Sequence, residues 1–227
     1  MKYQAVVFDL DGTLLDTLTD LWNSVNEACR EYGCAPRTRL QVRRALGNGL
    51  ENLLRKSLPQ EDGNKFQRVF QDFRAYYLKH CNEATRPYDG IPELLKDLQA
   101  LGVKLAIVSN KAHPAVLSLR DRYFPETMKV AMGESQGVRR KPAPDTVVRA
   151  LEELGIPKDQ AVYVGDSEVD KMTADNVGMD CFLVTWGFRD RDELAALRPT
   201  ALIDRPEQIL EKIKDRENTG QYRVQAV

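Results

Sequence analysis

The sequence contains little cysteine and histidine and carries almost no net charge. Its 227 residues include four cysteines and two histidines, and the formal net charge is −1. The cysteines form no C-x-x-C pair, which argues against a zinc cluster and a disulfide framework; they are Cys29, Cys34, Cys81 and Cys181. With 30% charged and 42% hydrophobic residues, the composition gives no case for a nucleic-acid or membrane surface.

Long apolar runs are missing as well. No run approaches the length of a transmembrane helix, and Asp9 and Asp11 interrupt the N-terminal apolar segment, which is wrong for a signal peptide. We therefore expect a cytoplasmic protein that binds neither membranes nor nucleic acids. The chain is long enough for one large domain with an insertion, and its sequence carries no signal about oligomeric state.

The first strand organises the rest of the chain. The apolar run from Ala5 to Phe8 predicts a strand buried on both faces, and two carboxylates one residue apart, Asp9 and Asp11, follow it. In an open parallel sheet this position is the carboxyl edge, where ligands bind. Asp9 is therefore the first candidate for chemistry.

Two carboxylates in a confined site repel each other unless a cation neutralises them or one of them holds a proton. A small set of oxygen ligands favours Mg²⁺, which keeps several waters and leaves positions open for phosphate oxygens. Gly12 allows a tight turn beside such a ligand, and Thr13 offers a hydroxyl and a backbone N–H. The same residues would also suit a simple turn leaving a strand.

Residues 16–88 have the pattern of a small helical bundle. Apolar residues recur three and four positions apart; they include Leu18, Leu21, Trp22, Val25 and Ala28 at the start and Phe66, Val69, Phe70, Phe73 and Tyr77 near the end. We interpret the aromatic face from Phe66 to Tyr77 as core packing. Asp16 at the start of this region fits a helix N-cap better than a catalytic role.

From residue 89 onward, strands and helices alternate. We expect strands at 105–108, 161–164 and 181–185, a short strand at 129–132, helices at 91–101, 115–122 and 145–154, and a frayed helix with a loose tail from Glu211. Strands separated by helices predict an α/β fold with a doubly wound, Rossmann-like parallel sheet. The core would comprise 1–15 and 89–227, and 16–88 would be an all-helical cap domain inserted after the first strand. Such a cap can exclude water from a reaction.

Polar residues follow two of the later strands. Ser109, Asn110 and Lys111 come after the strand at 105–108, although a helix N-cap would also explain them. Asp166 ends the strand at 161–164, and Asp170 lies one helical turn further along on the same face.

A proline follows Lys141, the last residue of the basic triplet Arg139-Arg140-Lys141. Pro142 restricts the backbone beside Lys141, so that this ammonium group could be held at a defined point. Residues of such a triplet usually lie on a solvated surface. Lys141 stands out because the predicted site needs a cation that faces a phosphate.

Taken together, these motifs resemble those of the haloacid dehalogenase superfamily, in its phosphoglycolate phosphatase-like branch. The four motifs appear in the order of the family as Asp9-x-Asp11-Gly12-Thr13, Ser109-Asn110, Lys141-Pro142 and Gly165-Asp166-Ser167-x-x-Asp170. The resemblance runs from Val6 to about Arg189 and includes Tyr88-Asp89-Gly90 and Trp186-Gly187-Phe188-Arg189. It implies a hydrolase acting on phosphoric monoester bonds, with a helical cap between the first two motifs.

The resemblance also implies a role for each motif residue. Asp9 would attack phosphorus to form an aspartyl phosphate, and Asp11 would protonate the leaving alcohol and then deprotonate water. Mg²⁺ would be held by the Asp9 carboxylate, the Asp11 backbone carbonyl and Asp166, with Asp170 supporting them. The phosphate would be bound by Thr13, Ser109, Asn110 and Lys141.

Several alternatives stay open at this stage. A haloalkanoic acid dehalogenase would need neither Mg²⁺ nor a second aspartate two positions on, so Asp11 and Asp166 favour a phosphatase. A phosphosugar mutase shares the first half-reaction, and a catalytically idle binding module could keep the fold. The substrate is expected to be a small phosphate ester resembling phosphoglycolate. Four cap residues could contact a second anionic group or simply be solvated: Arg43, Arg44, Asn48 and Arg55.

Overall fold

A parallel sheet forms the centre of the computed structural model, which describes residues 1–59 and 63–215. The strands are β1 (Ala5–Phe8), β4 (Lys104–Ala112), β5 (Val130–Glu134), β6 (Ala161–Gly165), β7 (Asp180–Val184) and β8 (Ala201–Ile203). They lie in the order β5-β4-β1-β6-β7-β8, and every neighbouring pair is parallel. The predicted doubly wound fold is confirmed, and 216–227 of the predicted core and tail lie outside the described residues.

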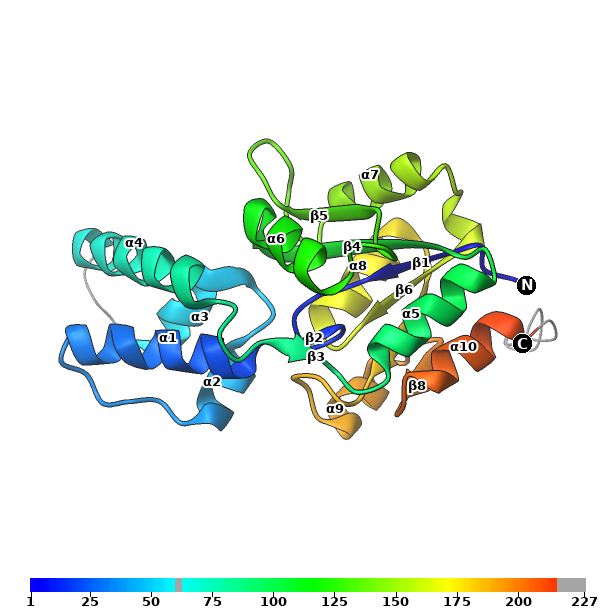
Figure 1. The fold of residues 1–227 in the computed structure, drawn as a ribbon. Helices are drawn as coiled ribbons and strands as arrows, with labels where there is room; N and C mark the ends of the chain where they lie inside the picture. The colour runs from blue at the N-terminus through cyan, green and yellow to red at the C-terminus, as the bar shows by residue number, and fades with distance from the viewer. Residues whose placement is uncertain (60–62, 216–227) are drawn as a thin grey trace, which may run out of the picture.

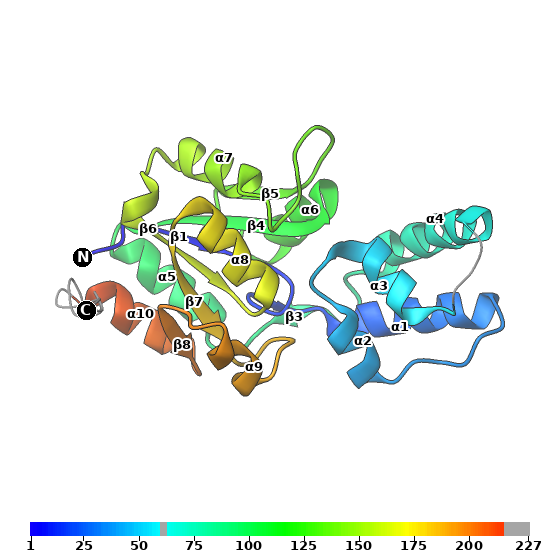
Figure 2. The same cartoon turned by 180° about the vertical axis from the view of Figure 1, so that it is seen from behind.

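Six helices cover the two faces of the sheet (Figures 1 and 2). Helices α5 (Ile91–Ala100), α6 (His113–Tyr123) and α10 (Glu207–Lys214) pack on one face, and α7 (Asp145–Leu154), α8 (Glu168–Val177) and α9 (Arg191–Ala196) on the other. Because successive side chains of a strand point to opposite faces, Val6 and Phe8 join the first core cluster, whereas Ala5 and Val7 join the second. The unbroken apolar run of β1 is thus explained by burial on both sides.

A helical unit separates β1 from α5 in the sequence. It consists of α1 (Leu18–Glu31), α2 (Arg39–Ala45), α3 (Gly49–Ser57) and α4 (Gly63–His80), which share one core. Leu15–Asp16 (β2) and Arg86–Pro87 (β3) form a two-residue antiparallel ladder at its base. The sequence pattern predicted only helices here, since a ladder this short has no periodicity of its own.

A buried carboxylate closes the base of the helical unit. Asp20 is 2% exposed and accepts hydrogen bonds from the backbone N–H groups of Glu83, Ala84 and Thr85 and from the Thr85 hydroxyl. These donors satisfy a charge that would otherwise be costly to bury. The two ends of the unit are therefore bound to each other as well as to the sheet.

Two strands differ from the sequence prediction. β4 continues through Ser109, Asn110 and Lys111, with a register shift against β5 between Val108 and Ala112. Polar residues that looked like the loop after a strand are therefore part of the strand. β8 was not predicted, because three residues between loops are too few to show a period.

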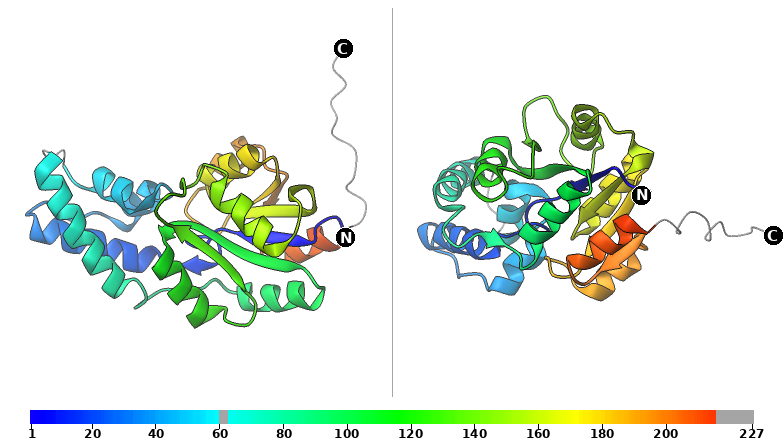
Figure 3. Two further views of the ribbon diagram at one scale, coloured as in Figure 1. Left: turned by 90° about the horizontal axis from the view of Figure 1, so that it is seen from above. Right: turned by 45° about the vertical axis from the view of Figure 1, so that its right-hand side comes forward.

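The helical unit lies beyond the carboxyl ends of the central strands (Figure 3). The strand order reverses at β1, with β4 on one side and β6 on the other, and such a switch point leaves a crevice at the carboxyl edge. The unit covers that crevice. None of the helices in the described part of the chain is long and apolar enough to cross a membrane.

Candidate active site

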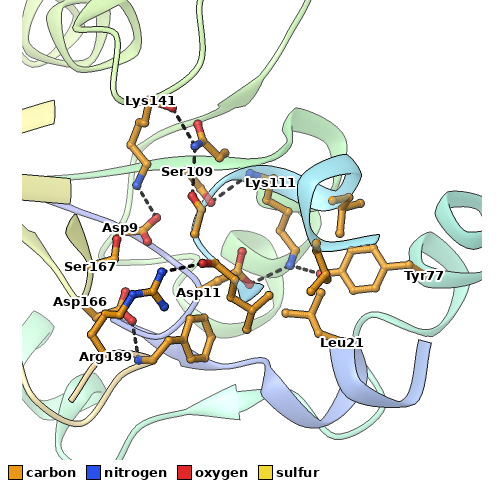
Figure 4. Close-up of a pocket in the computed structure, with 17 residues that line it drawn as sticks. Asp9, Asp11, Leu21, Tyr77, Ser109, Lys111, Lys141, Asp166, Ser167 and Arg189 are labelled. Carbon is orange, nitrogen blue, oxygen red and sulfur yellow. Dashed lines mark hydrogen bonds and ion pairs between the residues drawn. The ribbon is translucent and has the colours of Figure 1, made fainter. Parts of the chain in front are cut away.

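A cavity of about 60 Å³ lies between the helical unit and the carboxyl edge of the sheet (Figure 4). Its core side is lined by Asp9, Asp11, Ser109, Asn110, Lys111, Lys141, Asp166, Ser167, Phe188 and Arg189. Its other side is lined by Leu21, Leu46, Gly47, Gly49, Leu50, Leu53 and Tyr77 from the helical unit. Except for Thr13 and Asp170, every residue of the predicted site lines this cavity.

Lys141 links two of the buried carboxylates. Its Nζ lies 2.9 Å from Asp9 Oδ1 and 2.7 Å from Asp170 Oδ1, and it donates a hydrogen bond of 2.9 Å to the Tyr163 hydroxyl. The Lys141 side chain is only 3% exposed. Although burial opposes the charge, Asp170 and Asp9 raise the pKa of Lys141 well above its ordinary value, so the side chain is a permanent cation beside Asp9.

The backbone of Gly12 packs directly against the carboxylate of Asp166. A Cβ atom on Gly12 would lie 2.5 Å from Asp166 Oδ2, and Gly12 has a φ of +88°. Both facts require glycine at this position. Asp166 accepts hydrogen bonds from the Phe188 backbone N–H at 2.6 Å and from the Thr13 hydroxyl at 3.3 Å. Thr13 is fully buried and does not line the cavity, so its hydroxyl holds Asp166 in this arrangement.

The positive charges near Asp9 and Asp166 do not fully offset the cost of burying these two carboxylates. Burial raises the pKa of Asp9 to about 7, with Lys141 opposing the rise and Asp170 and Asp11 adding to it. Burial, together with Asp170 and Asp9, raises the pKa of Asp166 well above its ordinary value. Single oxygens of Asp9, Asp166 and Asp170 lie within 4.8 Å of one another. A hard divalent cation fits this set because it would neutralise the first two carboxylates and takes oxygen ligands.

Asp170 is already fully occupied. Its Oδ1 accepts from Lys141 and from the Tyr163 hydroxyl, and its Oδ2 accepts from the Asp166 and Ser167 backbone N–H groups and from the Ser167 hydroxyl. Burial opposes ionisation here, but these donors, Lys141 first, hold the pKa of Asp170 below its ordinary value. Asp170 is thus arranged to position Asp166 and Lys141, with no free oxygen for a direct metal bond.

Ser109 and Asn110 bring hydroxyl and amide groups to the cavity from β4. Both are buried, and the Ser109 hydroxyl accepts from the Lys111 backbone N–H at 3.2 Å. The Asn110 side-chain amide donates to the carbonyl of Lys141 at 3.0 Å and to that of Gly47 at 3.5 Å. Its buried Oδ1 has no hydrogen-bond partner among the residues that the structure describes. The Asn110 side chain therefore braces the Lys141 loop against β4 in this arrangement.

Lys111 has contacts that the sequence did not predict. Its Nζ donates a 2.8 Å hydrogen bond to Asp11 Oδ1 and another to the hydroxyl of Tyr77 on α4. The Lys111 side chain is 3% exposed, and Figure 4 shows it between the two partners. Burial opposes its charge, but Asp11 and Tyr77 raise the pKa of Lys111 above its ordinary value. The strand-end position of this lysine was the only available signal.

Polar contacts also join the helical unit to the loop after β7. Arg189 forms two hydrogen bonds with the Glu168 carboxylate, at 2.7 and 2.8 Å, and donates to the Leu46 carbonyl at 2.8 Å. Arg43 pairs with Asp190 at 2.7 Å and donates to the Gly187 carbonyl at 3.2 Å. These contacts hold the helical unit over the cavity.

The four cap residues suggested as substrate contacts lie elsewhere. Arg43 is engaged with the loop after β7, as described, and Arg44 is exposed. Arg55 pairs with Glu51 and stacks on Phe66, 3.8 Å from the ring centre. Neither these three nor Asn48 line the cavity. A helical pattern indicates which residues share a face, but the docking of that face decides which of them reach a ligand.

The chain was compared with known proteins. A family model described as "Haloacid dehalogenase-like hydrolase" matches residues 6–184. A phosphoglycolate phosphatase from Pseudomonas savastanoi pv. phaseolicola is 33% identical over 211 residues, which cover 88% of this chain and 75% of that protein. An N-acetylmuramic acid 6-phosphate phosphatase from Pseudomonas aeruginosa is 29% identical over 218 residues, covering 93% of this chain and 95% of that protein.

Solved structures match the fold over nearly its full length. One is a protein provisionally named a phosphoglycolate phosphatase from Lactobacillus delbrueckii subsp. bulgaricus, with a TM-score of 0.88 and 37% identity. The match covers 94% of this chain and 99% of that one. A predicted phosphoglycolate phosphatase from Haemophilus somnus gives a TM-score of 0.86 at 25% identity, over 93% of this chain and 98% of its own.

Proposed function

Because this chain belongs to the haloacid dehalogenase-like hydrolases and is a phosphatase, we propose that it hydrolyses a small phosphate monoester with Mg²⁺, through an aspartyl phosphate on Asp9. The observation that carries the proposal is the placement of Asp9 between the Lys141 ammonium, 2.9 Å away, and the Asp166 carboxylate. A nucleophile needs a cation beside it to approach an anionic phosphate. Residues 16–88 would be the cap, and 1–15 with 89–227 the catalytic core.

Asp9 would attack phosphorus and become phosphorylated, and water would then release inorganic phosphate. Lys141 offsets the charge of the nucleophile and of the transferring group, since it is buried and already contacts Asp9. Ser109 would donate its hydroxyl proton to a phosphate oxygen, and Asn110 would contribute through its backbone N–H group, while Thr13 would support the site through its hydroxyl bond to Asp166. Splitting one difficult displacement into two easier ones is the advantage of covalent catalysis.

Asp11 would move the proton in both steps. It would first protonate the leaving alcohol and then take a proton from the attacking water. Its side chain is 19% exposed at the cavity and pairs with Lys111, and it is not one of the three carboxylates whose oxygens lie within 4.8 Å of one another. An acid and base needs to face the leaving group, so this placement at the cavity agrees with the proposed role.

The metal would be held by the carboxylates of Asp9 and Asp166 and the backbone carbonyl of Asp11. The chemistry supplied by bound Mg²⁺ is neutralisation of charge on the nucleophile and the phosphate oxygens. Asp170 would support this set by fixing the Asp166 backbone and Lys141, as its five hydrogen bonds indicate.

The substrate would have a compact leaving group. The cavity of about 60 Å³ is smaller than the ~150 Å³ cavity that admits a benzene molecule. A two-carbon acid such as glycolate fits such a space better than a sugar does, and several relatives are named phosphoglycolate phosphatases. A larger leaving group would require the cap to move.

The four cysteines are free thiols, which supports a reducing compartment such as the cytoplasm.

A substrate panel tests this function. Phosphate release should be measured with phosphoglycolate, sugar phosphates, nucleotides and pyrophosphate, each with Mg²⁺ and with EDTA. We expect Mg²⁺-dependent release with the highest kcat/KM on phosphoglycolate. If the folded protein released no phosphate from any ester in the presence of Mg²⁺, the proposed function would be wrong.

A further inference from the structure

We propose that Lys111 is a positioning residue for Asp11 and that the Tyr77 hydroxyl makes this positioning depend on the seated cap. The inference rests on the proposed function, since it concerns the acid and base of that reaction. It assigns a role to two residues that belong to none of the four motifs. One lies on β4 of the core and the other on α4 of the cap.

The contacts form a chain from the cap to the reacting group. Lys111 Nζ donates to Asp11 Oδ1 at 2.8 Å and to the Tyr77 hydroxyl, and the side chains of Lys111 and Tyr77 are almost completely buried. A buried ammonium group has few alternative partners, so it holds the carboxylate it contacts in one place. The rotamer of Asp11 is thereby fixed by Lys111.

Among the described residues, Tyr77 is the only cap residue with a polar side chain at the cavity. Of the seven cap residues that line it within the described part of the chain, five are apolar or glycine on α3 or in the loop before it. Leu21 on α1 is apolar as well, which leaves the Tyr77 hydroxyl as the cap's one polar side-chain group there. When the cap lifts, Lys111 must lose this partner, and the hold on Asp11 weakens.

Lys141 shows what a lysine without this coupling looks like. It is equally buried, but its three partners, Asp9, Asp170 and Tyr163, all belong to the core. Its arrangement does not depend on the position of the cap. The two lysines therefore have different roles. Lys141 binds the phosphate in any cap position, whereas Lys111 positions Asp11 only when the cap is seated.

The test compares two kinds of leaving group. An alkoxide needs a proton from Asp11 to leave, whereas the acetate of acetyl phosphate, a compact leaving group, departs without one, so misplacing Asp11 should slow phosphorylation only with an alkyl phosphate. Dephosphorylation needs Asp11 as base with either substrate. A displaced Asp11 therefore predicts a burst of about one acetate per active site, followed by slow turnover.

The variants are Lys111→Met, Tyr77→Phe and the control Tyr32→Phe. Tyr32 also lies in the cap and its hydroxyl contacts Asp72, but it does not line the cavity. On an alkyl phosphate we expect kcat to fall about 100-fold in Lys111→Met, the effect of a misplaced group. We expect kcat on the same substrate to fall about 10-fold in Tyr77→Phe, which is the effect of losing one hydrogen bond. KM should change less than about threefold, and Tyr32→Phe should behave as the parent protein.

Three outcomes would overturn the inference. Equal losses on both substrates without a burst would mean that Lys111 is merely structural. A rise in KM confined to carboxylate-bearing esters would mean that Lys111 binds substrate. Unchanged kinetics in Tyr77→Phe would remove the link to the cap, and this conservative variant decides the matter if Lys111→Met does not fold. A parent protein inactive on both substrates would contradict the proposed function itself.

Discussion

The two halves of the cavity are built on different principles. On the phosphate side, Asp9, Lys141 and Asp166 belong to the core, and their hydrogen-bond partners also belong to the core. On the leaving-group side, one core pair, Asp11 and Lys111, faces a wall that the cap supplies. Charge is concentrated in the first half and apolar surface in the second.

This difference separates chemistry from selection. The phosphate is common to every substrate of such an enzyme, so the groups that bind it can be fixed permanently by buried networks. The leaving group varies, and its surroundings come from an element that can move and be changed independently. The following predictions test this division, from the largest expected effect to the smallest.

Removal of Asp9, the proposed nucleophile, should have the largest effect. Asp9→Asn should lower kcat by about 10³-fold or more, because an amide is a poor nucleophile toward phosphorus. The fold should persist, since a neutral amide is easier to bury than a carboxylate. Phosphate release and a thermal melt would check both statements. Retained activity would show that another residue attacks phosphorus and that the first half of the comparison is misassigned.

Loss of Lys141 should affect stability as well as activity. Lys141→Met leaves the buried carboxylates of Asp170 and Asp9 without their cation, and breaking such a network costs about 3–5 kcal/mol. Denaturant unfolding would measure the loss. The double variant Lys141→Met, Asp170→Asn should recover part of it, because it removes one of the stranded charges. Full additivity of the two changes would contradict the network.

Removal of the metal should abolish turnover and lower stability moderately. Saturating Mg²⁺ at 100 times its dissociation constant would stabilise the folded protein by about 2.7 kcal/mol. The expected signs are loss of phosphate release in EDTA and a rise in Tm when Mg²⁺ is added. Asp166→Asn should remove the rise in Tm. An unchanged rise in that variant would place the metal away from Asp166.

Weakening the contact between cap and core should have a small effect. Arg43→Ala breaks the pair with Asp190, which is 57% exposed, so the change in stability should not exceed about 1 kcal/mol. A cap that opens more often should raise KM a few-fold. Arg44→Ala is the matched control, because Arg44 is exposed. Equal effects in the two variants would mean that Arg43 does not hold the cap on the core.

The smallest effect on stability is expected at the pair of Lys2 and Asp180, which lies away from the cavity. Although burial opposes it, hydrogen bonds from Lys2 and Tyr3 hold the pKa of Asp180 below its ordinary value. This contribution is complete above the ordinary pKa of about 3.9 and is lost as the pH falls through the lower folded value. Stability measured from pH 6 down to acid should therefore fall less steeply in Asp180→Asn. An identical slope would mean that the pair contributes nothing.

The sequence was sufficient for most of the sheet and for most of the residues on the core side of the cavity. Apolar runs such as Ala5–Phe8 mark buried strands, and a polar residue at the end of such a run lies at the shared carboxyl edge. Asp9, Ser109, Lys141 and Asp166 follow from this rule together with the family motifs. Thr13 has a supporting position that spacing does not reveal, because its hydroxyl is directed at Asp166.

The leaving-group side was far less accessible. Tyr77 has the spacing of a core residue and is one, so nothing in the pattern indicates that its hydroxyl reaches Lys111. The same applies to Arg43 and Arg55, whose partners depend on how the helices dock. Periodicity specifies which residues share a face of one element, whereas these contacts join elements far apart in the sequence.

The position of β1 at the centre of the sheet also determines when the site can exist during synthesis. Its residues pair with Lys104–Ile107 on one side and Ala161–Val164 on the other, so β1 is synthesised well before either of its neighbours. Closing such long loops is slow compared with forming local helices. The cap helices can thus form while β1 is still unpaired. The nucleophile becomes buried only after Asp166 has been synthesised, and a nascent chain has no assembled catalytic site before that point.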